Sequence, residues 1–210
     1  MNYVYLHGFA SSPASSTATY FRNRFAERGL DLAVPALDNG DFAHLTITAQ
    51  LQAVAKAAGT GDVTVIGSSL GGYLAALYAA RHSEVQRIVL MAPAFCFPRR
   101  WEAELGSEAF EAWRRTGSRE VFHYGEGRER AIGFGLIEDG LQYEDYPAPK
   151  CPALVLHGVN DTVVPVSYSR EFARRQGELV RLVEYASDHA LADVTPAIWE
   201  ETARFLFQKS

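Results

Sequence analysis

The 210-residue sequence contains little cysteine, no long apolar stretch and no extended run of like charges. Cys96 and Cys151 are its only cysteines and lack the spacing of a metal site, so we expect free thiols in a reducing compartment rather than a disulfide scaffold. The absence of about 18 consecutive apolar residues and of a basic leader favours a cytoplasmic protein without a membrane span. Its 25 acidic and 20 basic residues are interspersed, so a nucleic-acid partner is not expected.

The composition is that of an ordinary globular protein. Hydrophobic residues make up 48% of the chain and charged residues 21%, which is enough to build one core without covalent staples. We therefore expect a single domain over residues 1–210, either monomeric or dimeric. The sequence has no His-Glu-x-x-His, no clustered carboxylates and no Gly-x-Gly-x-x-Gly, so we expect no metal and no cofactor.

Short apolar runs alternate with helical patterns along the chain, which is typical of parallel strands joined by crossover helices. The predicted strands are residues 3–6, 32–34, 63–66, 87–90, 153–156 and 179–183. The predicted helices are residues 17–27, 45–58, 70–81, 167–175 and 196–207. Most of the strands are continuously apolar, as expected when helices cover both faces of a sheet. The predicted fold class is α/β, with a doubly wound, mostly parallel six-stranded sheet.

One connection is much longer than a crossover helix requires. Residues 94–148 separate the fourth and fifth predicted strands, and we interpret them as a crossover that carries a cap-like insert. A helix is predicted around residues 100–113. We expect the insert to lie over one edge of the sheet.

The strongest local signal is the motif Gly-x-Ser-x-Gly at residues 67–71, where an apolar strand meets an alanine-rich helical segment. This arrangement is typical of a nucleophile elbow, a sharp turn that requires small residues two positions before and after the nucleophile. Ser69 is therefore the candidate nucleophile. Its place at a helix N-terminus favours the negative charge that develops in acyl transfer. The alternative is a glycine-rich turn that binds an anion or has no catalytic role.

A serine nucleophile needs a histidine base that is held by a carboxylate, in the chain order Ser, acid, His. His189 follows the last predicted strand and is the histidine in the required place. The histidines that do not fit are His7, His44, His82, His123 and His157. Asp161 follows the fifth predicted strand and is the predicted acid, because sites in such sheets lie at the carboxyl ends of strands. Asp188 is the less favoured acid, because adjacent residues rarely orient each other's side chains.

An oxyanion hole requires two N–H donors. We expect one from the backbone of Leu70, the residue after the nucleophile, and one from the loop after the first strand. In that loop Phe9 is the predicted donor, because Gly8 allows the chain to turn close to the substrate. His7 is interpreted as a packing residue beneath the loop.

These motifs resemble the α/β-hydrolase superfamily over nearly the whole chain outside the insert. Residues 6–13 (LHGFASSP) and 67–73 (GSSLGGY) are similar to small YqiA-type bacterial esterases. Residues 92–95 (APAF) and 136–140 (LIEDG) resemble the mitochondrial acyl-protein thioesterase that cleaves acyl glucuronides, and its bacterial relatives.

The resemblance implies a compact α/β-hydrolase fold that lacks the first two strands of the usual eight-stranded plan. Carried over residue by residue, it implies the same five residues as the motifs and their chain order. Ser69, Asp161 and His189 would be catalytic, and Phe9 and Leu70 would donate to the oxyanion.

The predicted function is that of a serine carboxylesterase, which cleaves small-molecule esters with small to medium apolar acyl or aryl groups through an acyl-enzyme. The first alternative is a thioesterase acting on acyl-proteins or acyl-CoA. The non-enzymatic alternative is a ligand-binding receptor on a hydrolase fold, which a fluorophosphonate probe would fail to label.

The insert provides the candidate substrate pocket. Residues 94–148 hold 10 of the 25 aromatic residues, and Phe95, Phe97, Trp101 and Trp113 are the predicted contacts. Eleven acidic against seven basic residues in the insert disfavour polyanionic leaving groups such as coenzyme A. The arginine pairs at 99–100 and 114–115 are interpreted as solvated.

Overall fold

The computed structural model describes residues 1–208 and contains a central sheet of five parallel strands, in the order β1-β2-β3-β6-β7. The strands are β1 (Asn2–Leu6), β2 (Val63–Ser68), β3 (Val85–Met91), β6 (Ala153–Gly158) and β7 (Val180–Tyr185). Every neighbouring pair is parallel. The predicted doubly wound parallel sheet is confirmed.

The prediction of a sixth strand over residues 32–34 is wrong. This segment forms only an isolated bridge, in which Ala33 exchanges backbone hydrogen bonds with Tyr3 and Tyr5 at the edge of β1. Pro35 follows immediately and has no N–H to donate, so the pairing cannot continue.

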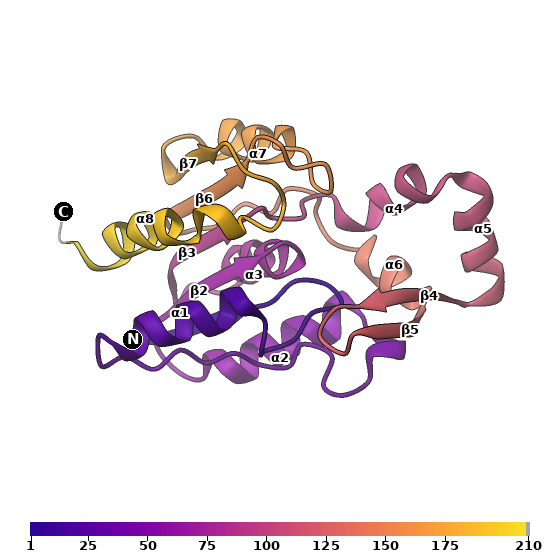
Figure 1. Cartoon of the computed structure of the whole chain (residues 1–210), viewed down its shortest axis with the longest axis horizontal. Helices are drawn as coiled ribbons and strands as arrows, with labels where there is room; N and C mark the ends of the chain where they lie inside the picture. The colour runs from indigo at the N-terminus through magenta and orange to yellow at the C-terminus, as the bar shows by residue number, and fades with distance from the viewer. Residues whose placement is uncertain (209–210) are drawn as a thin grey trace.

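Helices cover both faces of the sheet (Figure 1). The helices α1 (Ser16–Ala26) and α8 (Thr195–Phe207) pack with the strands into one core cluster. The helices α2 (Ile47–Ala58), α3 (Leu70–Arg81) and α7 (Ser167–Gln176) share the other cluster. Side chains alternate between the two faces along each strand, so Val65 belongs to one cluster and Ile66 to the other. None of the helices within residues 1–208 has the length and apolarity needed to cross a bilayer.

The insert contains three helices and a hairpin. Its elements are α4 (Phe97–Leu105), α5 (Ser107–Thr116), β4 (Ser118–His123), β5 (Arg128–Gly133) and α6 (Gly135–Gly140). The single helix predicted over residues 100–113 is two helices, because Gly106 has a φ of +78° and ends the first. The antiparallel hairpin was not predicted, since five of its twelve strand residues are charged and no apolar alternation marks the strands.

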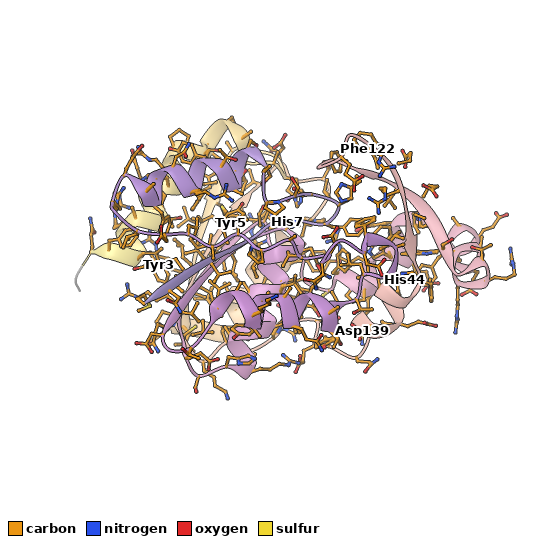
Figure 2. All side chains as sticks on the ribbon, turned by 90° about the horizontal axis from the view of Figure 1, so that it is seen from below. Tyr3, Tyr5, His7, His44, Phe122 and Asp139 are labelled. Atoms are coloured by element: carbon orange, nitrogen blue, oxygen red, sulfur yellow. The ribbon has the colours of Figure 1, made fainter. Side chains whose placement is uncertain are left out.

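The insert lies at the end of the molecule where the strands have their carboxyl ends (Figure 1). Figure 2 shows Tyr3, Tyr5 and His7 in succession along β1 and its following loop, with Phe122 and Asp139 of the insert beyond them. Asp139 anchors the insert to α2, because its carboxylate accepts hydrogen bonds from the Thr48 backbone N–H at 2.8 Å and from the Thr48 hydroxyl at 2.6 Å. A carboxylate at a helix N-terminus is favoured by the helix dipole.

Candidate active site

Ser69 occupies the turn between β2 and α3 in a strained backbone conformation, with φ 54° and ψ −118°. The two glycines of the motif are required by close packing. A Cβ atom on Gly67 would lie 2.1 Å from the carbonyl oxygen of Gly71, and one on Gly71 would lie 2.2 Å from that of Leu6. The geometry therefore has the features of a nucleophile elbow, and it holds the Ser69 side chain at the end of the sheet.

The structure brings Ser69, His189 and Asp161 into one hydrogen-bonded chain. His189 Nε2 lies 3.0 Å from Ser69 Oγ, and His189 Nδ1 lies 2.6 Å from Asp161 Oδ2. A carboxylate only accepts hydrogen bonds, so Nδ1 carries the hydrogen and Nε2 is left to accept from the serine hydroxyl. This is the arrangement in which a histidine removes a proton from serine.

Asp161 is completely enclosed and fully hydrogen-bonded. Its side chain is 0% exposed, and Oδ1 accepts from the backbone N–H groups of Val163 and Val164 at 2.8 and 2.7 Å. Burial alone would raise the pKa of Asp161, but hydrogen bonds from His157, His189 and Val164 outweigh it and hold the pKa well below its usual range. Asp161 is therefore ionised at neutral pH, and its Oδ2 accepts a hydrogen bond from Nδ1 of His189.

Asp188 lies beside the same cavity but does not contact the ring of His189. Its Oδ1 accepts from the backbone N–H of Ala190 at 2.9 Å, so it caps a turn of its own loop. The geometry thus joins Asp161, and not Asp188, to His189.

The remaining histidines have other partners. His44 pairs with Asp41 at the surface, and His82 with Glu84. His7 and His123 are buried near the loop after β1, where burial lowers the pKa of His7. His157 is the exception that sequence reasoning missed: its Nε2 lies 3.1 Å from Asp161 Oδ2. The available signal was its position at the end of a strand, four residues before the acid.

The two predicted oxyanion donors are the backbone N–H groups of Leu70 and Phe9. Leu70 is the first residue of α3, so its N–H has no intrahelical acceptor. Within residues 1–208, neither the Leu70 nor the Phe9 N–H donates to a protein atom. A Cβ atom on Gly8 would lie 3.4 Å from Ser69 Cβ, which shows how closely the loop after β1 approaches the serine.

Ser69 and His189 line a cavity of about 1210 Å³ between the sheet and the insert. One wall comes from the first turns of α1 and α8, and the opposite wall comes from α4 and the hairpin. The lining residues of the insert include Phe97, Trp101, Arg119, Val121 and Phe122.

The predicted pocket residues divide into two pairs. Phe97 and Trp101 line the cavity and contact Phe9, with ring centroids 5.9 and 5.7 Å from the Phe9 ring. Phe95 and Trp113 do not line it. Phe95 stacks on Phe172 at 4.3 Å in the core, and Trp113 is buried behind Trp101 with its indole N–H donating to the Ile132 carbonyl.

The groups available for a metal ion are few. Among the side chains of residues 1–208, no cluster of three or more His, Cys, Asp or Glu residues has the arrangement of a metal site. Both cysteines are free, and burial raises the pKa of the Cys151 thiol to about 11.

Solved structures identify the fold. The mouse α/β-hydrolase domain-containing protein 10 superposes with a TM-score of 0.79 at 20% identity, over 97% of this chain and 89% of that chain. Est1E from Butyrivibrio proteoclasticus with bound ferulic acid gives 0.77 at 19% identity, over 99% and 90%. The esterase domain of a Rhodothermus marinus protein gives 0.67 at 17% identity, over 97% and 85%. The chain therefore has the α/β-hydrolase fold.

The family is defined by the sequence. No curated protein matches the sequence significantly. The model of the uncharacterised protein family UPF0227 matches residues 2–206, so the chain belongs to this family.

Proposed function

We propose that the protein is a serine hydrolase that cleaves carboxylic esters with small to medium apolar acyl or aryl groups. The observation that carries the proposal is the chain of hydrogen bonds from Ser69 through His189 to Asp161, which opens into an aromatic-walled cavity. Neighbours of the same fold that are named as hydrolases and esterases support the same class of reaction.

In the first step the ester carbonyl lies beside Ser69 with its oxygen toward the N–H groups of Phe9 and Leu70. His189 Nε2 takes the hydroxyl proton while Ser69 Oγ forms a bond to the carbonyl carbon. The carbonyl electron pair moves onto oxygen, where the two N–H donors and the N-terminus of α3 stabilise the charge. When this intermediate collapses, the bond to the leaving oxygen breaks and His189 donates its proton to the alcohol.

In the second step water replaces the alcohol. His189 Nε2 removes a proton from the water as its oxygen attacks the acyl carbon, and the acid leaves when Ser69 Oγ recovers the proton. Asp161 remains ionised throughout and stabilises the imidazolium that forms in each half-reaction. The low pKa of Asp161 suits this role, because the acid does not take the proton itself.

The cavity wall next to Ser69 favours an apolar or aromatic acyl group. Phe9, Phe97 and Trp101 form a cluster of rings with centroids 5.7 to 5.9 Å apart, which presents ring faces and edges to a bound aryl group. Est1E, which shares the fold, binds ferulic acid, itself an aromatic acid. This likeness supports aryl esters as the first substrates to examine.

The proposal is tested with a fluorophosphonate probe and p-nitrophenyl esters. Wild-type protein should become labelled at Ser69 and hydrolyse the esters, whereas Ser69→Ala should lose labelling and about 10³- to 10⁶-fold in kcat. Ser68→Ala is the matched control, since it changes the adjacent serine of the same turn. An unlabelled wild-type protein, or labelling that survives Ser69→Ala, would exclude the proposed mechanism.

A further inference from the structure

A second histidine lies behind the candidate acid, on the side away from Ser69. His157 and Ser169 are both 0% exposed, and neither lines the cavity. His157 Nδ1 lies 2.7 Å from the hydroxyl oxygen of Ser169, which comes from α7. His157 Nε2 lies 3.1 Å from Asp161 Oδ2 and 2.8 Å from the carbonyl oxygen of Val164.

These contacts determine which ring nitrogen carries the hydrogen. Both partners of Nε2 are acceptors, one an ionised carboxylate and one a carbonyl, so Nε2 must be protonated. In the neutral ring Nδ1 is then an acceptor, and the Ser169 hydroxyl donates to it. The next carboxylate, Glu184 on β7, is paired in register with His157, but Arg170 of α7 binds it through two hydrogen bonds of 2.7 Å. Asp161 is therefore the carboxylate that accepts a hydrogen bond from His157.

His157 acts on both parts of the loop that carries the acid. The Asp161 oxygen that it contacts, Oδ2, is the same oxygen that holds His189. The Val164 carbonyl that it contacts belongs to the residue whose N–H binds Asp161 Oδ1. One buried imidazole thus holds the carboxylate and the backbone that surrounds it.

We propose that His157, held by Ser169, is a positioning residue that keeps the Asp161 carboxylate aligned with His189. The inference rests on the proposed function, because the alignment matters only if His189 is the base. His157 contacts no substrate, so its loss affects the chemical step and leaves substrate binding nearly unchanged. A misalignment of about 1 Å in such a unit costs on the order of 100-fold in rate.

The test compares two substitutions at position 157. His157→Leu removes the donor at similar volume and should lower kcat roughly 10- to 100-fold, with KM unchanged within about 2-fold. His157→Gln places an amide N–H close to the position of Nε2 and should recover most of the lost kcat. Equal activities of His157→Leu and wild type would overturn the proposal, and so would equal losses in His157→Leu and His157→Gln.

A measurement on wild-type protein keeps the proposal testable even if both variants fail to fold. Nitrogen-15 NMR of the histidine rings should show that the neutral form of His157 carries its hydrogen on Nε2. A ring protonated only at Nδ1 would contradict the geometry. If wild-type protein neither hydrolyses esters nor reacts with fluorophosphonate, the proposed function fails, whereas this spectrum still reports the state of His157.

The far wall of the cavity contains an arginine of the insert, Arg119. The insert has seven arginines, and five of them have a carboxylate within 4.0 Å: Arg99, Arg100, Arg114, Arg128 and Arg130. Of the other two, Arg115 is exposed and lies away from the cavity, whereas Arg119 is partly buried and lines it. Among residues 1–208, no carboxylate lies within 4.0 Å of Arg119.

The Arg119 guanidinium is placed by two indole rings. Its central carbon lies 5.6 Å from the Trp101 ring centroid and 5.5 Å from that of Trp113. Along this wall the Phe9 ring contacts the Trp101 ring, and the Trp101 ring contacts the Arg119 guanidinium. The acidic residues that also line this side, Glu120 and Glu129, are exposed at the rim, and Glu104 is paired with Arg100.

We infer that Arg119 binds a single carboxylate at the end of the substrate remote from the ester. This inference also rests on the proposed function, whose substrate class it narrows. A guanidinium binds a carboxylate through two parallel N–H donors, and one arginine matches one negative charge.

Matched p-nitrophenyl esters test the inference. Half-esters of dicarboxylic acids of increasing length are compared with esters in which a methyl group replaces the carboxylate. Arg119→Gln should lower the preference for the charged member about 10- to 100-fold at the favoured length, Arg119→Lys should lower it less, and Arg115→Gln should leave it unchanged. An unchanged preference in Arg119→Gln would overturn the inference, whereas a wild-type protein inactive on every ester would instead refute the proposed function.

Discussion

The sheet scaffold and the insert of residues 94–148 present side chains to the same cavity but hold them differently. In the scaffold, Asp161 is 0% exposed and its carboxylate binds two backbone N–H groups and two histidines. In the insert, Trp101 is partly buried and is held by ring contacts with Phe9 and Trp113. Hydrogen bonds have preferred lengths and angles, so they fix the positions of the atoms that they join. Ring packing is less specific, because other side chains of similar shape can replace a ring. The residues proposed for the reaction are thus held by hydrogen bonds, whereas those proposed for substrate contact are held by ring packing.

The largest expected effect concerns the acid in the scaffold. Asp161→Asn should lower kcat roughly 10³- to 10⁴-fold, because an amide in place of the carboxylate neither fixes the His189 tautomer nor stabilises its charge. Asp188→Asn is the matched control, since Asp188 lines the same cavity but its carboxylate accepts a hydrogen bond only from the Ala190 N–H of its own loop. It should stay within a few-fold of wild type. A severe loss in Asp188→Asn with a mild one in Asp161→Asn would reverse the assignment of the acid.

Two tryptophans separate packing from substrate contact within the insert. Trp113 is 2% exposed, so Trp113→Ala should lower the free energy of unfolding by about 3–5 kcal/mol. Trp101 lines the cavity, so Trp101→Ala should lower kcat/KM for aryl esters about 10- to 100-fold more than for acetyl esters, with a smaller loss of stability. Urea denaturation and an ester series measure the two effects. Similar outcomes for both variants would argue against this division of the insert.

Glycine substitutions compare the packing of the two regions. Gly71→Ala should destabilise the protein by about 3 kcal/mol or more, because the new Cβ would lie 2.2 Å from a backbone oxygen of β1. Gly135→Ala is the matched helical control in the insert, where no atom lies within 4 Å of the added Cβ. It should be neutral or slightly stabilising. The midpoints of urea denaturation compare the stabilities of the two variants with that of wild type. An unchanged midpoint in Gly71→Ala would mean that the turn at Ser69 is less tightly packed than the structure indicates.

The smallest effect is the acid dependence of stability. The pKa of Asp161 is lower in the folded protein than in the unfolded chain, where an aspartate titrates near about 3.9. Its ionisation therefore stabilises the fold fully above about pH 4, and this contribution is lost as pH falls through the folded pKa, by at most about 1.4 kcal/mol per pH unit.

In the insert the corresponding group is Glu126, whose pKa is lowered chiefly by a hydrogen bond from Arg128 at the surface. Salt should screen the Glu126 contribution but leave that of buried Asp161. Unfolding of Asp161→Asn and Glu126→Gln at several pH values, in low and high salt, measures both. An acid dependence in wild type that vanishes in high salt would show that Asp161 is not its source.

Much of the scaffold was predictable from the sequence because its signals are local. The predicted helix over residues 70–81 coincides with α3, and the five predicted strands that formed lie within one or two residues of their observed bounds. The elbow was recognisable because only glycine fits at positions 67 and 71. His189 and Asp161 followed from chain order, because parallel strands bring their following loops to one edge of the sheet.

The insert was less predictable because its structure depends on distant contacts. Five of the twelve strand residues of the hairpin are charged, and no apolar alternation marks its strands. The hairpin instead packs on a distant segment, because His123 contacts Phe42 and Gly133 lies against the Ala43 backbone. The division of the four aromatic candidates into two lining and two core residues depends on helix orientation, which no local pattern encodes. The role proposed for His157 could not be predicted for the same reason, since His157 lies on β6 and its partner Ser169 comes from the helix α7.

The sequence by itself predicted the parallel α/β class, the sharp turn at Ser69 and the candidate residues Ser69, Asp161 and His189. These predictions were possible because short-range sterics and strand direction depend on neighbouring residues. Only the tertiary structure showed that His157 contacts Asp161 and that Arg119 lines the cavity with no carboxylate of residues 1–208 within 4.0 Å. The scarcity of cysteine and of like-charge runs excluded whole classes of protein. Composition could not predict which residues contact one another, because contacts between distant segments depend on how helices and loops pack in three dimensions.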